Sequence, residues 1–456
     1  MAAGQRADRK WAIRPSWRLA GTCGRGPRAL QSRWQCAVAL TETPLRKEQT
    51  YVKSALEGLR VLDLSRVLAG PWAGQTLADF GADVVKVERP KSGDDTRSWG
   101  PPFIGPESNG MSAYFGAANR GKDSLCVDLG NPEGQALLRR LAGECDVLIE
   151  NFRVGTMARF GLDFGTLRGI NNQLIYCSVT AFGQDGPECD TAGYDAMIQA
   201  MGGLMSITGA ADDEAGAGPQ KVGVAVADLF SGMYAVSAIL AALQARARDG
   251  DGQFIDIALM DCQVAMLANQ AMNFLVGGSA PVRLGTAHPN IVPYQAFATR
   301  NGHIMVAVGN DKQFGRFVAA LGEPGLADDT DYVTNRARVR NRAALLPILA
   351  KLLARHDTAE WVNRFKQAGV PCGPVNTDAV FDEPQVRHRE LRIDLHATDG
   401  TIPGVANPVR FSATPVQYRC APPRLGENGG RVLREWLDLS ESEIAALSEA
   451  EAIQLC

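Results

Sequence analysis

The sequence predicts an α/β protein with a Rossmann-like parallel sheet. Strand-like apolar runs alternate with helical segments from about residue 56 to residue 276, which is typical of a parallel sheet with helices on both faces. A loop rich in Gly and Pro, residues 277–293, then precedes a smaller unit with its own strand and helices. Helical segments return near the C-terminus. We therefore expect a large domain built from both chain ends and a smaller inserted α+β domain.

Six strand-like runs form the basis of the predicted sheet. Parallel strands bring their carboxyl ends to one edge of a sheet, and ligands in such folds bind at that edge. The residues that follow each run are therefore the first candidates for a site. We expect the strands at residues 60–64 (RVLDL), 83–88 (DVVKVE), 124–129, 146–151 (DVLIEN), 174–182 (LIYCSVTAF) and 254–259.

Several of the helical segments carry recognisable end signals. Asn131 and Pro132 suit a helix N-terminus, as cap and first-turn residue. Gly250 follows a long helical pattern as a C-cap would. Ser440 and Glu443 have the spacing of a capping box. The expected helices cover residues 72–80, 131–145, 229–248, about 261–275 and 430–437, with a last one starting near Ser440.

These elements divide the chain into domains. We expect residues 52–276 to form the N-terminal part of the large domain. Residues 285–375, with a strand at 303–308, form the small domain. Residues 395–456 return to the large domain. The sequence has no internal repeats.

The overall composition is that of an ordinary globular protein. Of 456 residues, 45% are hydrophobic and 21% are charged, and the formal net charge is −3. No apolar run approaches the length that spans a bilayer, so we expect no membrane insertion. The ten cysteines include no C-x-x-C pair, which argues against a disulfide framework and against a zinc site. We expect no metal.

The N-terminus differs from the rest of the chain. Residues 1–41 carry eight basic residues and one acid, with Trp11, Ile13, Trp17 and Leu19 interleaved. This pattern is typical of a mitochondrial transit peptide. A nucleic-acid-binding arm is the competing interpretation, but the basic character stops abruptly and the remaining chain is acidic. We therefore expect a mitochondrial matrix protein that does not bind nucleic acid.

Histidine is scarce and confined to the later part of the chain. All five histidines lie at or beyond His288. No His-dependent triad or metal cluster can be assembled within residues 1–287. Carboxylates and backbone dipoles must therefore carry any chemistry of the N-terminal half.

Asp228 is the carboxylate that stands out. It follows an apolar run, residues 222–227, and opens a long helical pattern. Apolar neighbours desolvate a carboxylate, which raises its pKa and sharpens it as a nucleophile or base. The alternative is structural, since Asp is a preferred helix N-cap.

Basic and amide side chains follow two of the expected strands. Lys86 and Arg89 end the second strand, where Arg can grip a phosphate bidentately or can simply face water. Asn151 ends another strand, and Arg159 follows in the next helix. The loop after the first strand, SRVLAGPWAG (65–74), lacks the G-x-G-x-x-G fingerprint of dinucleotide-binding proteins.

At this point nine segments together resemble the family III CoA-transferases, which include formyl-CoA transferases, carnitine CoA-transferases and α-methylacyl-CoA racemases. Each segment is a weak signal alone, but their order is specific, and the resemblance covers about residues 56–450. The segments are GLRVLDLSRVLAGP (58–71), GADVVKVE (81–88), NRGK (119–122), DVLIENF (146–152), AFGQDGP (181–187), GYD (193–195), the stretch around Asp228, HPNIVPY (288–294) and GVPCGPVN (369–376).

The resemblance implies a mechanism and a partner set. In the transferases of this family an Asp that matches Asp228 attacks the acyl-CoA thioester, giving an aspartyl anhydride and then an aspartyl-CoA thioester. A CoA thioester is thus a substrate, and no permanently bound cofactor is expected. The family forms interlocked homodimers. By similarity, Arg89, Asn151 and Arg159 hold the CoA nucleotide, and Phe152 and Phe160 line the apolar part of the site.

Two other functions compete with CoA transfer. In the racemase branch, the Asp that matches Asp195 works with a His upstream of it, and this chain has no His before position 288. Asp195 is then a helix cap, a support for the site or a substrate contact. A non-catalytic CoA-binding or redox protein of Rossmann type is the third alternative, disfavoured by the missing glycine fingerprint.

The resemblance also bears on the substrate. Formyl-CoA transferases carry Gln where this chain has Leu68, and a glycine-run loop where it has only a short segment near residues 283–289. We therefore expect a larger acid than formate or oxalate. The pattern is closest to mitochondrial members that move CoA from succinyl-CoA to glutarate or a related dicarboxylic acid. A second carboxylate needs a cation, and the candidates are Arg120, Lys122, Arg283 and His288.

Overall fold

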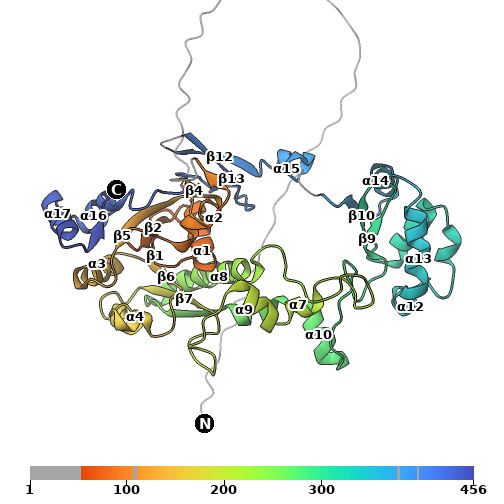
Figure 1. Ribbon diagram of the computed structural model, residues 1–456, viewed down its shortest axis with the longest axis horizontal. Helices are drawn as coiled ribbons and strands as arrows, with labels where there is room; N and C mark the ends of the chain where they lie inside the picture. Colours follow the sequence, from red (N-terminus) through yellow and green to blue (C-terminus); the bar gives the residue numbers. More distant parts are fainter. Residues whose placement is uncertain (1–52, 106–109, 377–379, 398–399) are drawn as a thin grey trace, which may run out of the picture. The chain divides into compact units, whose positions relative to one another are not determined.

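The computed structural model describes residues 53–105, 110–376, 380–397 and 400–456, so the predicted transit peptide lies outside the described residues. Its main feature is a seven-stranded sheet (Figure 1). Neighbouring strands are parallel, except that the last strand of the chain pairs antiparallel at one edge. The predicted mixed α/β fold with a parallel-dominated large sheet is confirmed. In spatial order the strands are β14 (Ile453–Gln454), β5 (Lys122–Val127), β2 (Asp83–Glu88), β1 (Arg60–Asp63), β6 (Val147–Glu150), β7 (Ile175–Thr180) and β8 (Phe254–Ala258).

The strand order reverses between β1 and β6. The chain first proceeds outward from β1 through β2 to β5, and then continues on the other side of β1 with β6, β7 and β8. The loops that leave β1 and β6 therefore run in opposite directions. In sheets of this kind the crevice at the reversal is the usual ligand site.

Helices cover both faces of the sheet. One face packs against α1 (Ala69–Asp79) and α8 (Val226–Asp249), with apolar side chains such as Val61 and Ile149 between them. The other packs against α3 (Pro132–Gly143), α16 (Gly429–Leu437) and α17 (Glu441–Glu449), around side chains such as Leu62, Leu148 and Leu433. Alternate residues of a strand point to opposite faces, so β1 and β6 contribute to both cores.

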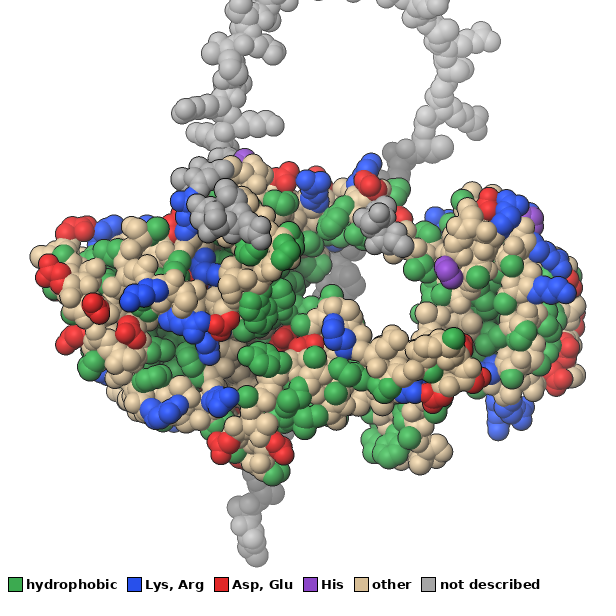
Figure 2. All heavy atoms as spheres, in the orientation of Figure 1, with side chains coloured by type: hydrophobic (Ala, Val, Ile, Leu, Met, Phe, Trp, Pro, Cys, Tyr) green, Lys and Arg blue, Asp and Glu red, His purple; other side chains and the backbone are tan. Residues whose placement is uncertain are grey.

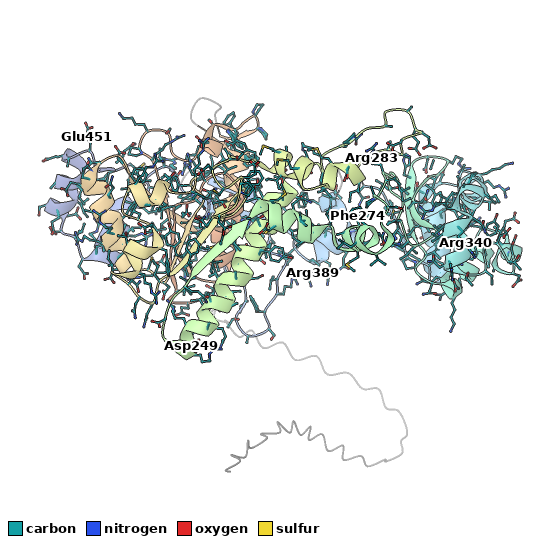
Figure 3. The ribbon with its side chains drawn as sticks, turned by 90° about the horizontal axis from the view of Figure 1, so that it is seen from below. Asp249, Phe274, Arg283, Arg340, Arg389 and Glu451 are labelled. Atoms are coloured by element: carbon teal, nitrogen blue, oxygen red, sulfur yellow. The ribbon has the colours of Figure 1, made fainter. Side chains whose placement is uncertain are left out.

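Helix α8 is longer and more apolar than the sequence prediction allowed. Among the described residues it is the one helix that is long and apolar enough to cross a bilayer, so the statement that no run approaches that length was wrong. The helix packs on α1 and on the sheet, and its buried side chains belong to the protein core. Gly232 permits this packing, because a Cβ there would lie 2.6 Å from the carbonyl oxygen of Ala69. In Figure 3 the helix runs out to Asp249.

Further helices connect the strands of the large sheet. Most of them were missed by the sequence prediction, because segments of four to seven residues are too short to display a helical period. They are α2 (Ala113–Ala118), α4 (Thr156–Arg159), α5 (Phe164–Arg168), α6 (Asp195–Met201), α7 (Leu204–Ile207), α9 (Leu259–Met266) and α10 (Ala268–Gly277), with a 3-10 turn at Asp95–Ser98.

A separate three-stranded antiparallel sheet, in the order β11-β10-β9, has its own apolar core around Phe317, Leu349 and Trp361. The bounds predicted for the two domains remain a prediction. The elements here are β9 (Tyr294–Ala298), β10 (His303–Ala307), α11 (Asp311–Ala320), a 3-10 turn (Pro324–Ala327), α12 (Asn335–Arg340), α13 (Arg342–Leu353), α14 (Thr358–Gln367) and β11 (Cys372–Pro374).

Two small hairpins escaped the sequence prediction. One pairs β3 (Phe103–Ile104) with β4 (Met111–Ser112), and the other pairs β12 (Arg392–Ala397) with β13 (Gly400–Val405). A 3-10 turn (Val380–Asp382) and α15 (Pro384–His388) precede the second hairpin.

The end signals were more reliable than the helix bounds. Asn131 caps α3, Gly250 ends α8 with φ of 87°, and the Ser440 capping box is complete. The single helix expected at about 261–275 is instead two, α9 and α10, which meet where Ala268 adopts a positive φ of 45°.

Candidate active site

A cavity of about 310 Å³ opens at the reversal of strand order. Its wall combines the loop after β1, the loop after β6, the end of β7 and the first turn of α8. The first three segments meet because β1, β6 and β7 are neighbours in the sheet, and the fourth joins them because α8 packs on α1 and the sheet. Among the residues in the wall are Arg66, Leu68, Asn151, Phe152, Arg153 and Asp228.

Asp228 stands in the first turn of α8, three residues after the N-cap position, which Ala225 occupies. The N-cap alternative for Asp228 was therefore wrong. In the described part of the chain its carboxylate has no hydrogen-bond or ion-pair partner, although the residue is half-buried. Burial, and secondarily the nearby Asp195 carboxylate, raises the pKa of Asp228 to about 7. The side chain is thus poorly solvated and chemically available, as a nucleophile requires.

Asp195 and Gln199 hold the start of α8 in place. The Asp195 carboxylate accepts hydrogen bonds from the Ala227 backbone N–H (2.8 Å) and from the Gln199 amide (2.6 Å). The Gln199 carbonyl in turn accepts from the Val222 N–H (2.8 Å). Asp195 is buried and has both oxygens engaged, so its contacts here are those of a support for the helix that carries Asp228.

The loop after β1 is held in an unusual conformation. Val67 has a positive φ of 68°, a region that a β-branched residue rarely adopts. Its N–H donates to both carboxylate oxygens of Asp94 (3.2 and 3.3 Å). The adjacent Arg66 has its backbone N–H and C=O bonded to the Asn151 amide, at 2.8 Å each. Both neighbours therefore support the strained residue in the cavity wall.

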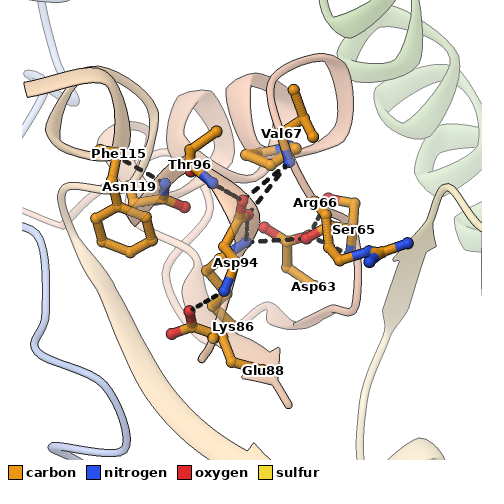
Figure 4. A network of polar contacts seen from close by, with 12 residues as sticks. Asp63, Ser65, Arg66, Val67, Lys86, Glu88, Asp94, Thr96, Phe115 and Asn119 are labelled. Carbon is orange, nitrogen blue, oxygen red and sulfur yellow. Dashed lines mark hydrogen bonds and ion pairs between the residues drawn. The ribbon is translucent and has the colours of Figure 1, made fainter. Parts of the chain in front are cut away.

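Buried charges lie beneath this loop (Figure 4). Lys86, from β2, pairs with Asp94 (2.9 Å) and donates to the Ser65 carbonyl (2.8 Å). Burial alone would raise the pKa of Asp94, but attraction to Lys86 and hydrogen bonds from Thr96 lower it to about 2. Asp63, at the end of β1, pairs with Lys122 (2.8 Å). Both pairs are fully buried, so each charge depends on its partner.

A second cavity of about 260 Å³ lies between the ends of β2 and β5 and the start of α4. Arg89, Phe152 and Phe160 line it, and Arg66 and Phe152 belong to both cavities. Figure 2 shows Lys and Arg side chains around apolar ones over the part of the molecule that holds α4 and β6. A cationic rim and an apolar wall suit a long ligand with a phosphate at one end.

The residues predicted to bind CoA have different surroundings. Arg89 donates to the Gly93 carbonyl (3.0 Å) and pairs with Asp95 at the rim of the second cavity. Arg159 is exposed, donates to Thr156 (3.1 Å) and lines neither cavity. The Asn151 amide is engaged by the backbone of Arg66.

Only one of the predicted substrate candidates lines the cavity that holds Asp228. That residue is Leu68, which is also the N-cap of α1. Arg120 is buried and bidentate to Asp79 (2.9 and 2.6 Å), and Lys122 pairs with Asp63, so neither cation is free to bind a substrate carboxylate. Asp195 lies behind the wall. Arg283 pairs with Asp212, and His288 stacks on Tyr294; neither Arg283 nor His288 lines the cavity.

Sequence reasoning missed Arg66 as a site residue. Arg66 belongs to the SRVLAGP segment directly after β1, at the sheet edge where ligands were expected. Its position after a strand was the only signal in the sequence, and the structure shows that Arg66 and Arg153 are the two Arg residues in the wall of this cavity. Among the residues that the structure describes, no three His, Cys, Asp or Glu side chains come together as metal ligands.

Comparison with known proteins decides the family. The model of CoA-transferase family III matches residues 56–429. This chain belongs to CoA-transferase family III. Family members use a CoA thioester as substrate, and the chain is therefore an enzyme of the CoA-transferase type.

Individual members of the family are similar to this chain over most of its length. Succinate–glutarate CoA-transferase of Agrobacterium fabrum is 50% identical over 400 residues, which cover 87% of this chain and 98% of that protein. Succinyl-CoA:glutarate CoA-transferase of Homo sapiens is 43% identical over 402 residues, 87% of this chain and 90% of the relative. The crystal structure of a CAIB/BAIF family protein from Brucella suis superposes with a TM-score of 0.75 at 50% identity, over 84% of this chain and all of that one.

Glu150 is a second buried acid near the site. It ends β6, and its carboxylate accepts a hydrogen bond from the Phe152 N–H (2.8 Å), which places it directly behind the cavity wall. Burial raises the pKa of Glu150 to about 7, and the hydrogen bonds from Ser178 and Phe152 only partly offset this effect. The unfolded chain, with a pKa near 4.5, loses this proton first as the pH rises.

We predict that Glu150→Gln changes the pH dependence of stability. In the wild type, the contribution of Glu150 is fully present below pH 4.5 and is lost as the pH rises to 7, by about 3 kcal/mol in total. The uncharged amide removes this loss. Chemical denaturation at pH 5 and at pH 8 should show the variant gaining stability relative to wild type only at the higher pH. If the free energies of unfolding of variant and wild type differ by the same amount at both pH values, ionisation of Glu150 does not destabilise the folded state.

Proposed function

We propose that this protein transfers CoA from succinyl-CoA to glutarate or a closely related dicarboxylic acid, with Asp228 as the nucleophile. The observation that carries the proposal is the unpartnered, half-buried carboxylate of Asp228 in the cavity at the strand-order reversal. The names of the Agrobacterium, mouse and human relatives support the choice of substrates, since these proteins are 43–50% identical over most of the chain.

The reaction proceeds in four balanced steps. The Asp228 carboxylate attacks the thioester carbonyl, the C–S bond breaks, and a succinyl-aspartyl anhydride and CoA thiolate form. The thiolate then attacks the aspartyl carbonyl and releases succinate, leaving an aspartyl-CoA thioester. Glutarate attacks that carbonyl and displaces the thiolate, giving a glutaryl-aspartyl anhydride. The thiolate finally attacks the glutaryl carbonyl, which yields glutaryl-CoA and restores Asp228. An anhydride preserves the activation of the thioester through each exchange.

The surroundings of Asp228 suit these exchanges. A carboxylate without hydrogen bonds is more nucleophilic than a solvated one, and its pKa of about 7 leaves a large ionised fraction at matrix pH. Asp195 and Gln199 fix the first turn of α8, so the nucleophile does not depend on a mobile loop. The uncapped N-terminus of α1, at Leu68 and Ala69, lies in the same wall and offers backbone N–H groups to an oxyanion.

The second cavity is the proposed place of the CoA moiety. Arg89 at its rim suits a phosphate, and Phe152 and Phe160 suit the apolar length of the ligand. In this proposal Asn151 acts by holding the Arg66 backbone, while Arg159 contacts the nucleotide from outside the two cavities.

Two alternative functions are weaker. An epimerase of the racemase type needs a base to partner Asp195, but both Asp195 oxygens are occupied by Ala227 and Gln199. A non-catalytic CoA-binding protein gives no reason for an unpartnered, half-buried carboxylate in the wall of the cavity.

We also propose an interlocked homodimer. Exposed apolar side chains cluster on α10, where Met272, Phe274, Leu275 and Val276 are 55%, 47%, 73% and 81% exposed, and Phe274 is labelled in Figure 3. An apolar surface of this kind is typical of a contact with another chain. Size-exclusion chromatography with light scattering tests this proposal.

Product analysis tests the proposed reaction. The purified protein lacking residues 1–41 is incubated with succinyl-CoA and a panel of carboxylic acids, and acyl-CoA products are identified by mass spectrometry. Glutaryl-CoA formed only when glutarate is present establishes the transfer. If no acid yields a new thioester, the epimerase and the binding protein become the leading candidates.

We predict that Asp228→Asn lowers transfer by at least about 10⁴-fold, because the amide cannot form the anhydride. The amide is nearly isosteric, so the thermal unfolding temperature should change little. In wild type, hydroxylamine trapping during turnover should label the peptide that contains Asp228. Full activity in the variant would place the nucleophile elsewhere.

The pH–rate profile should follow the ionisation of Asp228. Because the carboxylate is the reactive form, kcat/KM should rise tenfold per pH unit below about pH 7 and level off above it. Asp195→Asn removes one source of the raised pKa and should move the midpoint to lower pH, while its amide oxygen still accepts from Ala227. A midpoint that does not move in this variant contradicts the electrostatic coupling.

We propose that residues 1–41 direct the protein to the mitochondrial matrix, on the basis of their basic, acid-poor composition. Deletion of these residues should leave the activity of the purified enzyme unchanged and retain the protein in the cytosol. A matched variant keeps the length of this segment but replaces its eight basic residues by Gln, so that only the positive charge is removed. The measurement is fluorescence microscopy of a C-terminal fluorescent fusion. If the deleted form is still imported into mitochondria, the proposal is contradicted.

A further inference from the structure

In the proposed reaction, the cavity that holds Asp228 must accommodate a second carboxylate on each substrate. Both the succinyl group and glutarate carry a second carboxylate, remote from the carbon that reacts. That carboxylate leaves bulk water when the first one approaches Asp228, and a desolvated carboxylate needs a charged hydrogen-bonding partner. The cation must therefore belong to the wall of this cavity. The inference below rests on the proposed function.

Few cations meet that requirement. Arg120 and Lys122 are buried in pairs with Asp79 and Asp63. Arg283 and His288 lie outside the wall. Within the described ranges, the cavity is lined by two cationic side chains, those of Arg66 and Arg153.

Arg66 is oriented by its surroundings, but its guanidinium has few hydrogen-bond partners. The Asn151 amide fixes its backbone on both sides, and the guanidinium lies over the Phe152 ring at 5.3 Å. Within the part of the chain that the structure describes, its one polar side-chain contact is a long hydrogen bond from Nη1 to Asp95 (3.4 Å). Its Nε is buried without a hydrogen-bond partner. A donor that is buried, oriented and unsatisfied is costly unless a ligand completes it.

The second cation differs in each of these respects. Arg153 is exposed, and its side chain makes no hydrogen bond or ion pair within the described residues. No aromatic ring of the described residues lies against its guanidinium. An exposed, unrestrained Arg loses side-chain entropy on binding and discriminates less between ligands.

We propose that Arg66 binds the distal carboxylate of the dicarboxylic substrates and so selects them over monocarboxylic acids. Nε and one Nη offer the paired donors that a carboxylate accepts bidentately. Asp95 keeps Arg89 as its partner when the substrate takes over Arg66. Because the succinyl group and glutarate occupy the cavity in turn, one cation serves both the donor and the acceptor.

The test compares two acceptors that differ only at the distal end. Glutarate carries a carboxylate where pentanoate carries a methyl group. In Arg66→Gln, kcat/KM for glutarate should fall about 100-fold, the usual effect of removing one partner of a desolvated charge pair. The value for pentanoate should change less than about threefold, so the preference for the dicarboxylate collapses. The donors succinyl-CoA and butanoyl-CoA should show the same pattern.

Two further variants separate selection from other roles. Arg66→Lys keeps the charge but not the bidentate geometry, so it should restore part of the glutarate preference. Arg153→Gln changes the other cation in the wall and should leave the ratio of glutarate to pentanoate unchanged.

Each outcome has a definite meaning. If Arg66→Gln lowers kcat/KM equally for glutarate and pentanoate, Arg66 acts in CoA binding or in the loop structure, and the inference is overturned. It is also overturned if kcat/KM changes for neither acid. Wild-type enzyme measured in parallel tests the proposed function separately. If wild type transfers CoA to neither acid, the reaction itself is misassigned; if it prefers glutarate and the variant does too, only the role of Arg66 fails.

Discussion

The buried ion pair between Lys86 and Asp94 supports the part of the molecule on which the site depends. Lys86 reaches from β2 under the loop after β1, and Asp94 holds the Val67 N–H from the other side. Together with the Asp63–Lys122 pair, these contacts bring β1, β2 and β5 into one framework. Breaking such a pair leaves an uncompensated buried charge. The hydrogen bonds from the Val67 N–H to the buried Asp94 carboxylate would be lost if the strained backbone relaxed, and they help to maintain that conformation.

The acids around the cavity differ in whether their carboxylates have hydrogen-bond or ion-pair partners. Asp195, Asp94 and Asp63 have their oxygens bonded, and each supports a segment of backbone or a buried Lys. Asp228 is surrounded by the segments that these residues hold, but it has no partner of its own in the described structure. Its raised pKa is a consequence of that arrangement. Of these four acids, Asp228 is therefore the one whose carboxylate has no hydrogen-bond or ion-pair partner among the described residues.

Arg66 and Asn151 show how roles are divided at the sheet edge. Asn151 looks like a ligand-binding residue because it follows β6, but its amide is used on the backbone of Arg66. The consequence is an Arg whose backbone is fixed, while its guanidinium makes only a long contact to Asp95 among the described residues. The two cavities meet at Arg66 and Phe152, so the same pair of side chains borders the proposed CoA region and the proposed acyl region.

The sequence by itself determined the α/β class, the six parallel strands, the caps at Asn131, Gly250 and Ser440, and Asp228 as the leading candidate. These follow from local periodicity, from short-range end signals and from nine ordered segments that resemble one family. The tertiary structure alone decided which Arg residues line the cavity, that Arg120 and Lys122 pair with buried acids, and that Asp195 supports α8. The physical reason is that ion pairing and burial join residues dozens to hundreds of positions apart, and no local pattern encodes those distances.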